Sequence, residues 1–145
     1  MNWKPPLAAL ALALAAALTI QAGDAPVTYW DAAKVADALT KSGLITRTDA
    51  YMVTGSHREK PGQVEVHEKT TDILFVVEGE ALYVTGGKMI GGKQTRPGEW
   101  LGTDIEGGEE HHLKKGDVVV VPPNTPHWFK EVTKCNSFMV RINNP

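Results

Sequence analysis

The chain has 145 residues, with 15 lysines and arginines against 17 aspartates and glutamates, and a formal net charge of −2. This balance, together with the lack of any basic run, argues against nucleic acid as a partner. The single cysteine, Cys135, excludes an internal disulfide. We therefore expect stability to come from the core or from a bound metal, and we expect a buried, unreactive thiol rather than an exposed reactive one.

The first 22 residues have the layout of a secretory signal peptide. Lys4 precedes the apolar run Leu7–Ile20, and Ala22 provides a small residue at a cleavage point. The run is shorter than the roughly 20 residues that span a bilayer. We expect export to a periplasm or to the exterior, with no membrane contact after cleavage; a retained N-terminal anchor is the alternative. Residues 23–44 then form an N-terminal segment with a short helix, and residues 45–145 form the main domain.

The stretch "DAAKVADALTKSG" predicts that short helix. Asp31 can cap its N-terminus, and Gly43 suits a left-handed residue at its end. The apolar residues that share one face are Ala32, Val35, Ala36 and Leu39. We expect this face to pack against the outside of the domain that follows.

The rest of the chain predicts β-structure. Short runs of β-branched and aromatic residues alternate with Gly, Pro and Asn. The predicted strands are residues 50–57, 63–67, 73–79, 80–87, 111–116, 117–122, 127–132 and 137–143. Strands this short at such close spacing favour a β-sandwich or a small barrel.

The glycine-rich segment Gly86–Gly108 interrupts this pattern. It is too long for a hairpin turn, and its Trp, Leu and Ile are unusual in a plain linker. Two interpretations stay open: a loop at the mouth of a site, or a hairpin extension without a role.

Two stretches carry candidate chemistry. In "QVEVH" the side chains alternate, so Glu65 and His67 face one side of the strand while the valines face the other. In "GDVVVVPPNTPHWF" an apolar strand runs into a proline-rich corner, which delivers His127 to the start of the next strand. Prolines stiffen that corner because they fix φ.

These stretches resemble the two motifs of the cupin superfamily. The first motif is histidine, any residue, histidine, a gap of three or four, glutamate, a gap of six, and glycine. Here Glu65 stands at the first histidine, His67 at the second, Asp72 at the glutamate and Gly79 at the glycine.

The second motif runs from a glycine through a proline, a glycine and a histidine to an asparagine. Gly116, Pro122 and His127 match, Asn124 replaces the glycine, and Glu131 takes the asparagine position. The resemblance covers roughly residues 45–143. It implies an all-β fold, a small double-stranded β-helix or jelly-roll barrel, with the short helix at its N-terminus.

The resemblance also implies a metal site. Its ligands would be His67, His127, Glu65 and Asp72, and His57 is a weaker candidate for the missing histidine. Two imidazoles with carboxylates favour iron, manganese or nickel. Asp72 is shorter than glutamate, so it either reaches the metal or hydrogen-bonds a histidine. Whichever of Glu65 and Asp72 is not a ligand is a candidate general base.

Three hypotheses follow. In the first, the protein is an exported cupin that binds a divalent metal and acts on a small molecule by oxygenase, isomerase or lyase chemistry. In the second, it is a metal-free small-molecule-binding module. In the third, strand edges form a homodimer, which is compatible with either. No nucleophilic triad is recognised in the sequence, so any chemistry must come from a metal or a histidine–carboxylate pair.

Overall fold

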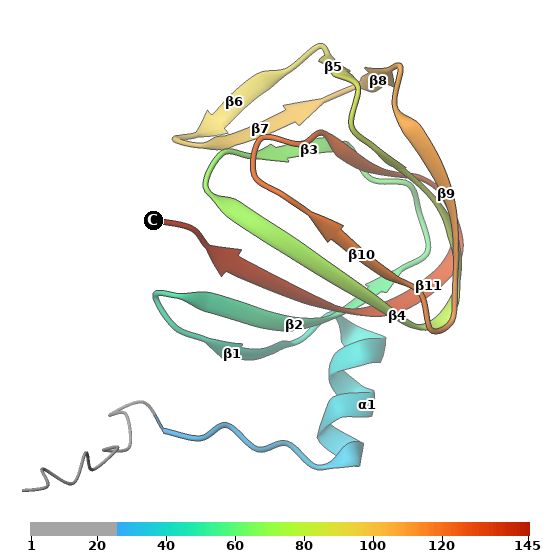
Figure 1. The fold of residues 1–145 in the computed structure, drawn as a ribbon. Coiled ribbons are helices and arrows are strands. Elements are labelled where there is room, and N and C mark those ends of the chain that lie inside the picture. The colour runs from blue at the N-terminus through green and yellow to red at the C-terminus, as the bar shows by residue number, and fades with distance from the viewer. Residues whose placement is uncertain (1–25) are drawn as a thin grey trace, which may run out of the picture.

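The computed structural model describes residues 26–145, and the expected signal peptide lies outside them. The elements are α1 (Ala32–Lys41), β1 (Leu44–Arg47), β2 (Tyr51–Arg58), β3 (Val64–His67), β4 (Thr70–Thr85), β5 (Lys88–Ile90), β6 (Lys93–Arg96), β7 (Glu99–Gly102), β8 (Asp104–Glu106), β9 (Glu109–Lys114), β10 (Val118–Val121) and β11 (His127–Asn143). The predicted all-β class with one short N-terminal helix is confirmed (Figure 1). The one helix of residues 26–145, α1, has 10 residues and is too short to span a membrane.

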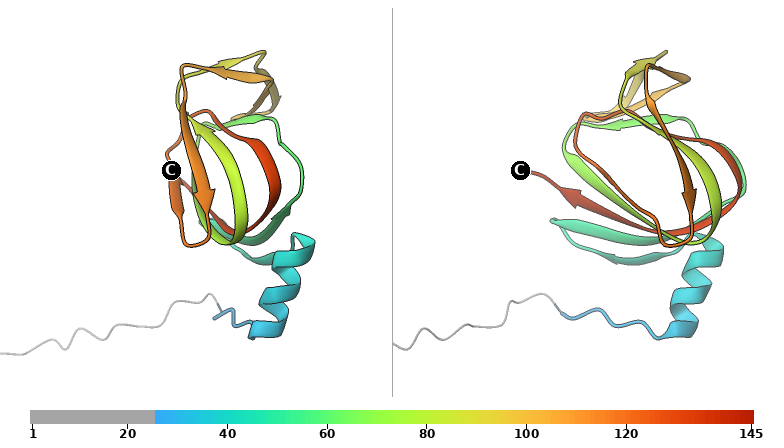
Figure 2. Two further views of the ribbon diagram at one scale, coloured as in Figure 1. Left: turned by 90° about the vertical axis from the view of Figure 1, so that its right-hand side faces the viewer. Right: turned by 45° about the vertical axis from the view of Figure 1, so that its right-hand side comes forward.

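Two long antiparallel strands, β4 and β11, hold the barrel together. They pair along their whole length, from His127 opposite Thr85 to Asn143 opposite Thr70. On its other edge β4 pairs first with β10 and then with β9, while β11 pairs with β3 and then with β2. Figure 2 shows these two strands curving side by side round the barrel. They therefore take part in both layers and join them.

The sequence predicted four short strands where the structure has these two long ones. Gly79, the expected break, adopts φ +81° opposite Cys135 and lies inside β4. A Cβ at this position would collide with the backbone carbonyl of Lys134. The glycine thus lets β4 pass close to its partner strand with an unusual backbone conformation, and pairing continues on both sides of it.

The helix caps one end of the barrel and packs against β2 (Figure 1). The predicted cap is confirmed, because the Asp31 side chain accepts a hydrogen bond of 2.9 Å from the Lys34 amide. The predicted stop is wrong by one residue: Ser42, at φ 58°, is left-handed instead of Gly43. The buried residues of the helix are Ala38 and Leu39, whereas Ala32 and Ala36 are exposed.

The core is apolar and lies between the layers. Its buried cluster comprises Leu74, Val76, Ala81, Tyr83, Leu113, Val121, Phe129 and Cys135. Burial raises the pKa of the Cys135 thiol, which fits the expected unreactive cysteine.

The glycine-rich segment forms the four short strands β5–β8 at the end of the barrel opposite the helix (Figure 1). β5 and β8 make a small separate ribbon, and β6 pairs with β7. β7 also pairs with β3, with His67 opposite Glu99. The segment therefore extends the sheet beside the strand that carries Glu65 and His67.

Candidate metal centre

Two histidines from distant parts of the chain meet inside the barrel. His67 ends β3 and His127 begins β11, where it is the direct partner of Glu65. The ring centroids are 5.1 Å apart, and each residue is only 5% exposed. The expected convergence of the two imidazoles is therefore found.

Both rings are held in the orientation that a metal ligand needs. His67 Nδ1 lies 2.7 Å from a carboxylate oxygen of Glu99, and His127 Nδ1 lies 3.0 Å from the Thr125 carbonyl oxygen. A carboxylate and a carbonyl only accept hydrogen bonds, so each Nδ1 donates. In the neutral rings the lone pair is then on Nε2, which faces the barrel interior. An outer acceptor on the other ring nitrogen is the usual support of a metal-bound histidine.

Glu65 completes a group that fits a divalent ion. One ligand atom each from Glu65, His67 and His127 lies within 4.8 Å of the other two. Two donors that are each about 2.1 Å from one ion are at most about 4.2 Å apart, so a small inward movement would suffice. Two imidazoles and one carboxylate suit iron(II) and neighbouring first-row metals, and leave positions open.

Asp72, on β4, approaches the two histidines from the opposite layer and forms an ion pair with Arg141. It is 2% exposed, and its two oxygens accept hydrogen bonds of 2.9 and 3.0 Å from Nε and Nη2 of Arg141, its partner across the strands. Its Oδ2 lies 3.5 Å from His67 Nε2 and 3.8 Å from His127 Nε2. Burial disfavours the carboxylate, but the hydrogen bonds to His67 and Arg141 prevail and lower the pKa of Asp72 to about 2.

The surroundings give the two histidines different pKa values. Burial lowers the pKa of His127. For His67 burial acts in the same direction, but hydrogen bonds to Asp72 and Glu65 outweigh it and raise the pKa to about 9. Arg141 disfavours protonation of His67. Its Nη2 lies 3.0 Å from His67 Nε2 and can donate a hydrogen bond there only when the ring is neutral. A metal also needs the neutral ring, so binding would release a proton.

Glu65 stays ionised in this setting. Burial acts to raise its pKa, but the hydrogen bond to His67 and the positive charges of His127, His67 and Arg58 lower it overall. Since the pKa values of Glu65 and Asp72 are both lowered, each carboxylate is a weak base near neutral pH and a ready partner for a cation.

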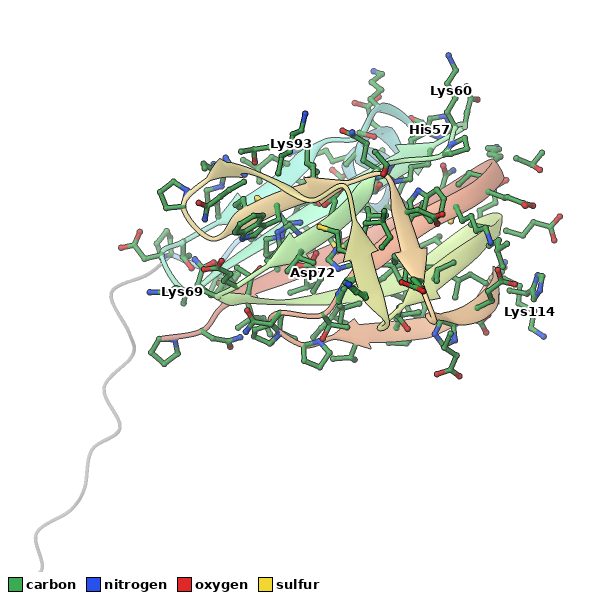
Figure 3. The ribbon with its side chains drawn as sticks, turned by 90° about the horizontal axis from the view of Figure 1, so that it is seen from above. His57, Lys60, Lys69, Asp72, Lys93 and Lys114 are labelled. Atoms are coloured by element: carbon green, nitrogen blue, oxygen red, sulfur yellow. The ribbon has the colours of Figure 1, made fainter. Side chains whose placement is uncertain are left out.

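His57, the weaker candidate, lies away from this group. Its Nδ1 is 2.6 Å from the Asn136 side-chain oxygen, and its Nε2 is 3.3 Å from Glu59. The alternation of β2 explains this, because Gly55 faces α1 and His57 shares that outer face. Seen from above, Asp72 lies toward the middle of the barrel and His57 near one edge (Figure 3).

Arg58 takes the inner face in place of His57. Its Nη2 lies 4.0 Å from Glu65, and its guanidinium stacks 4.6 Å from the centre of the Phe129 ring. Arg58 and Phe129, with Tyr83, line a cavity of about 20 Å³ beside His127. That volume holds about one water molecule, so this inner cavity has no room for an organic ligand as it stands.

Sequence reasoning missed two residues of the site, Glu99 and Arg141. Ser137, Met139 and Arg141 alternate along β11, and the first two face the interior. An arginine continuing an inward-facing series was the signal that could have identified it. Glu99 gave no such signal, because its position depends on the pairing of β7 with β3 inside an irregular segment.

The fold and the site define a small β-barrel protein with a buried histidine–carboxylate centre. The sequence profile of the cupin family matches residues 21–144, and the chain belongs to that family. No curated protein matches the sequence.

Solved structures agree in fold at low sequence identity. They include a protein of Neisseria meningitidis (TM-score 0.51, 14% identity, covering 75% of this chain and 96% of that one). They also include a protein of Klebsiella pneumoniae with a double-stranded β-helix domain (TM-score 0.50, 19% identity, 71% and 76%) and KdgF from a Halomonas species (TM-score 0.50, 18% identity, 70% and 78%). At these identities the likeness concerns the fold alone.

Proposed function

We propose that this protein is an exported cupin that binds one divalent metal ion, iron, manganese or nickel, and acts on a small organic molecule. Glu65, His67 and His127 are the proposed ligands. The observation that carries the proposal is the pair of buried imidazoles whose Nδ1 atoms are both held by outer acceptors. The apolar N-terminal run supports export.

The residues around the site have separate roles in this proposal. A bound metal would act as a Lewis acid that polarises a substrate oxygen. Glu99 and Thr125 orient the two rings, and Arg141 keeps Asp72 ionised at the rear of the site. Asp72, if it is not a ligand, remains the candidate base, although Arg141 makes it a weak one. Oxygenase, isomerase and lyase chemistry all remain compatible with this arrangement.

Metal content tests the proposal. Protein purified without an affinity tag, from cells supplied with iron, manganese and nickel, should contain close to one ion per chain by elemental mass spectrometry. The double variant His67→Ala, His127→Ala should contain almost none, because a single carboxylate cannot hold the ion. The matched control is His57→Ala, His112→Ala, which removes two histidines outside the site and should keep the metal. Wild-type protein without metal, or equal loss in the control, would refute the proposal.

A second candidate is a metal-free module that binds a small molecule. Arg141 favours it, because its guanidinium already contacts His67 Nε2 and neutralises Asp72. In this case the histidines would hydrogen-bond the ligand directly. The same metal assay separates the two candidates, since this one requires wild-type protein that contains no stoichiometric ion.

We also propose that the protein forms a homodimer through the free edge of β10, together with the exposed apolar side chains of β10 and β4 beside that edge. Val118, Val120 and Phe75 are 56%, 57% and 42% exposed there, and Val118 is the cross-strand partner of Phe75. Within residues 26–145 β10 pairs with β4 alone, so its second edge is free to meet a second copy.

Sedimentation velocity at micromolar concentration should show a dimer. Val118→Lys should convert it to a monomer, because two copies would bring buried lysines face to face. Val27→Lys, the same change at a site that is 94% exposed, should leave the dimer intact. A wild-type monomer would remove the basis of this proposal.

A further inference from the structure

A second cleft, of about 260 Å³, is lined by Arg141 and shares no lining residue with the inner cavity. Arg47 of β1, Arg96 of β6 and Arg141 of β11 line it, with Glu99 as the one carboxylate in its lining. It is thirteen times the volume of the inner cavity and suits a molecule of a few heavy atoms.

The cleft carries uncompensated positive charge. Arg96 lies 3.8 Å from Glu99 and is otherwise exposed. Within residues 26–145 the Arg47 guanidinium hydrogen-bonds only to the neutral sulfur of Met52, at 2.9 Å. The Nε and Nη2 groups of Arg141 donate hydrogen bonds to Asp72 and His67, whereas its Nη1 has no hydrogen-bond partner among residues 26–145. Counting Asp72, which pairs with Arg141, the three guanidinium groups exceed the nearby carboxylates, Glu99 and Asp72, by one positive charge, which attracts an anion and repels a metal ion.

A buried hydroxyl in the same lining also lacks a partner. Thr70 Oγ1 is inaccessible to solvent and makes no hydrogen bond within the described part of the chain. Leaving a buried polar atom unpaired is unfavourable, so such atoms usually have a function or a missing partner. An oxygen of a ligand in the cleft would supply that partner once rotation about the Cα–Cβ bond of Thr70 turned the hydroxyl toward the cleft.

We propose that this cleft binds the carboxylate of a small organic acid. Arg47, Arg96 and the free Nη1 of Arg141 hold its oxygens, and the Thr70 hydroxyl donates to one of them. The link to chemistry rests on the proposed function: Arg141 and Glu99 line the cleft and also contact His67, so the rest of the acid would extend toward the metal centre. Anion binding itself requires no metal.

The test is isothermal titration calorimetry at low ionic strength, on the chain after treatment with a chelator and again after loading with manganese. The probes are succinate, its neutral analogue succinamide, and inorganic phosphate. We expect succinate to bind in both states and succinamide in neither. Phosphate binding more tightly than succinate would overturn the choice of a carboxylate. Succinamide binding as well as succinate, binding only after metal loading, or no binding of any probe would overturn the cleft as an anion site.

Variants locate the binding. Arg47→Gln, Arg96→Gln should weaken succinate binding about tenfold or more, because each removes a charge-assisted hydrogen bond. Lys88→Gln, Lys93→Gln removes the same net charge from exposed positions outside the lining and should change affinity less than about twofold at moderate salt; Lys93 projects outward in Figure 3. Equal losses in the two double variants would overturn the assignment.

Thr70→Val tests the unpaired hydroxyl. It should weaken succinate binding by about threefold or more, without lowering the stability of the free protein, because the hydroxyl has no partner to lose. Unchanged affinity would remove Thr70 from the site. The metal assay is independent of these titrations: a metal-free protein that binds succinate refutes the proposed metal function and leaves the cleft standing.

Discussion

Replacing Arg141 with methionine is expected to lower the free energy of unfolding by about 3 kcal/mol, the largest effect of any single change at the site. The variant leaves the Asp72 carboxylate, which is 2% exposed, without the two hydrogen bonds of 2.9 and 3.0 Å that compensate its burial. Denaturant unfolding of the metal-free protein measures the loss. Arg47→Met is the matched control, since Arg47 has no carboxylate partner in the described part of the chain, and should cost less than about 0.5 kcal/mol.

A double-mutant cycle separates the ion pair from its surroundings. The double variant Asp72→Asn, Arg141→Met should be more stable than the sum of the two single effects predicts, by about 2 kcal/mol, because the second change no longer leaves a buried charge unpaired.

The dependence of stability on acidic pH gives a second measurement of the same ion pair. The pKa of Asp72 is lowered to about 2, so its contribution is complete above its ordinary pKa near 4 and is lost as the pH falls from about 4 to 2. Asp72→Asn should remove that part of the acid dependence. An Arg141→Met variant as stable as Arg47→Met would contradict the argument.

Arg141 also defines what a metal would have to displace. Its Nη2 occupies the approach to His67 Nε2 at 3.0 Å, whereas its contacts with Asp72 do not involve the three proposed ligands. A metal ion would take over only the contact with His67, and the pair with Asp72 would keep the arginine in place. The geometry therefore favours the three proposed ligands Glu65, His67 and His127, with the charge of Asp72 acting on the two histidines.

The parts of the fold that could be predicted are those with local signals. Alternation in "QVEVH" placed Glu65 and His67 on one face, and the proline-rich corner delivered His127 to the start of a strand, as found. The role of Asp31 as the helix cap was also predictable, because the hydrogen bond from a nearby amide to its side chain depends only on a few neighbouring residues.

The parts that could not be predicted depend on pairing between distant strands. Gly79 looked like a strand end, yet β4 continues through it because β11 pairs with it on both sides. The partner of Asp72 lies 69 residues away, and Glu99 meets His67 across 32 residues. Periodicity in one strand indicates which face a side chain occupies, but not which side chain of another strand lies opposite it.

Replacing Glu99 with glutamine should weaken metal binding about 10- to 100-fold, which is the usual cost of losing the acceptor behind a metal-bound histidine. Glu99 accepts the His67 Nδ1 proton at 2.7 Å, and the amide either donates there or accepts weakly, so it no longer fixes the tautomer or raises the basicity of Nε2. Competition with a chelator, using manganese and nickel, measures the affinity.

The matched control for that change is Glu68→Gln. Glu68 lies next to His67 in sequence, but its carboxylate accepts a hydrogen bond of 2.7 Å from the indole of Trp100 and makes no contact with either imidazole. Glu68→Gln therefore removes the same charge close to the site and should alter metal affinity less than about threefold, through screened electrostatics alone. Equal losses in the two variants would mean that the charge near the site matters and the orientation of His67 does not, and Glu99 would then have no positioning role.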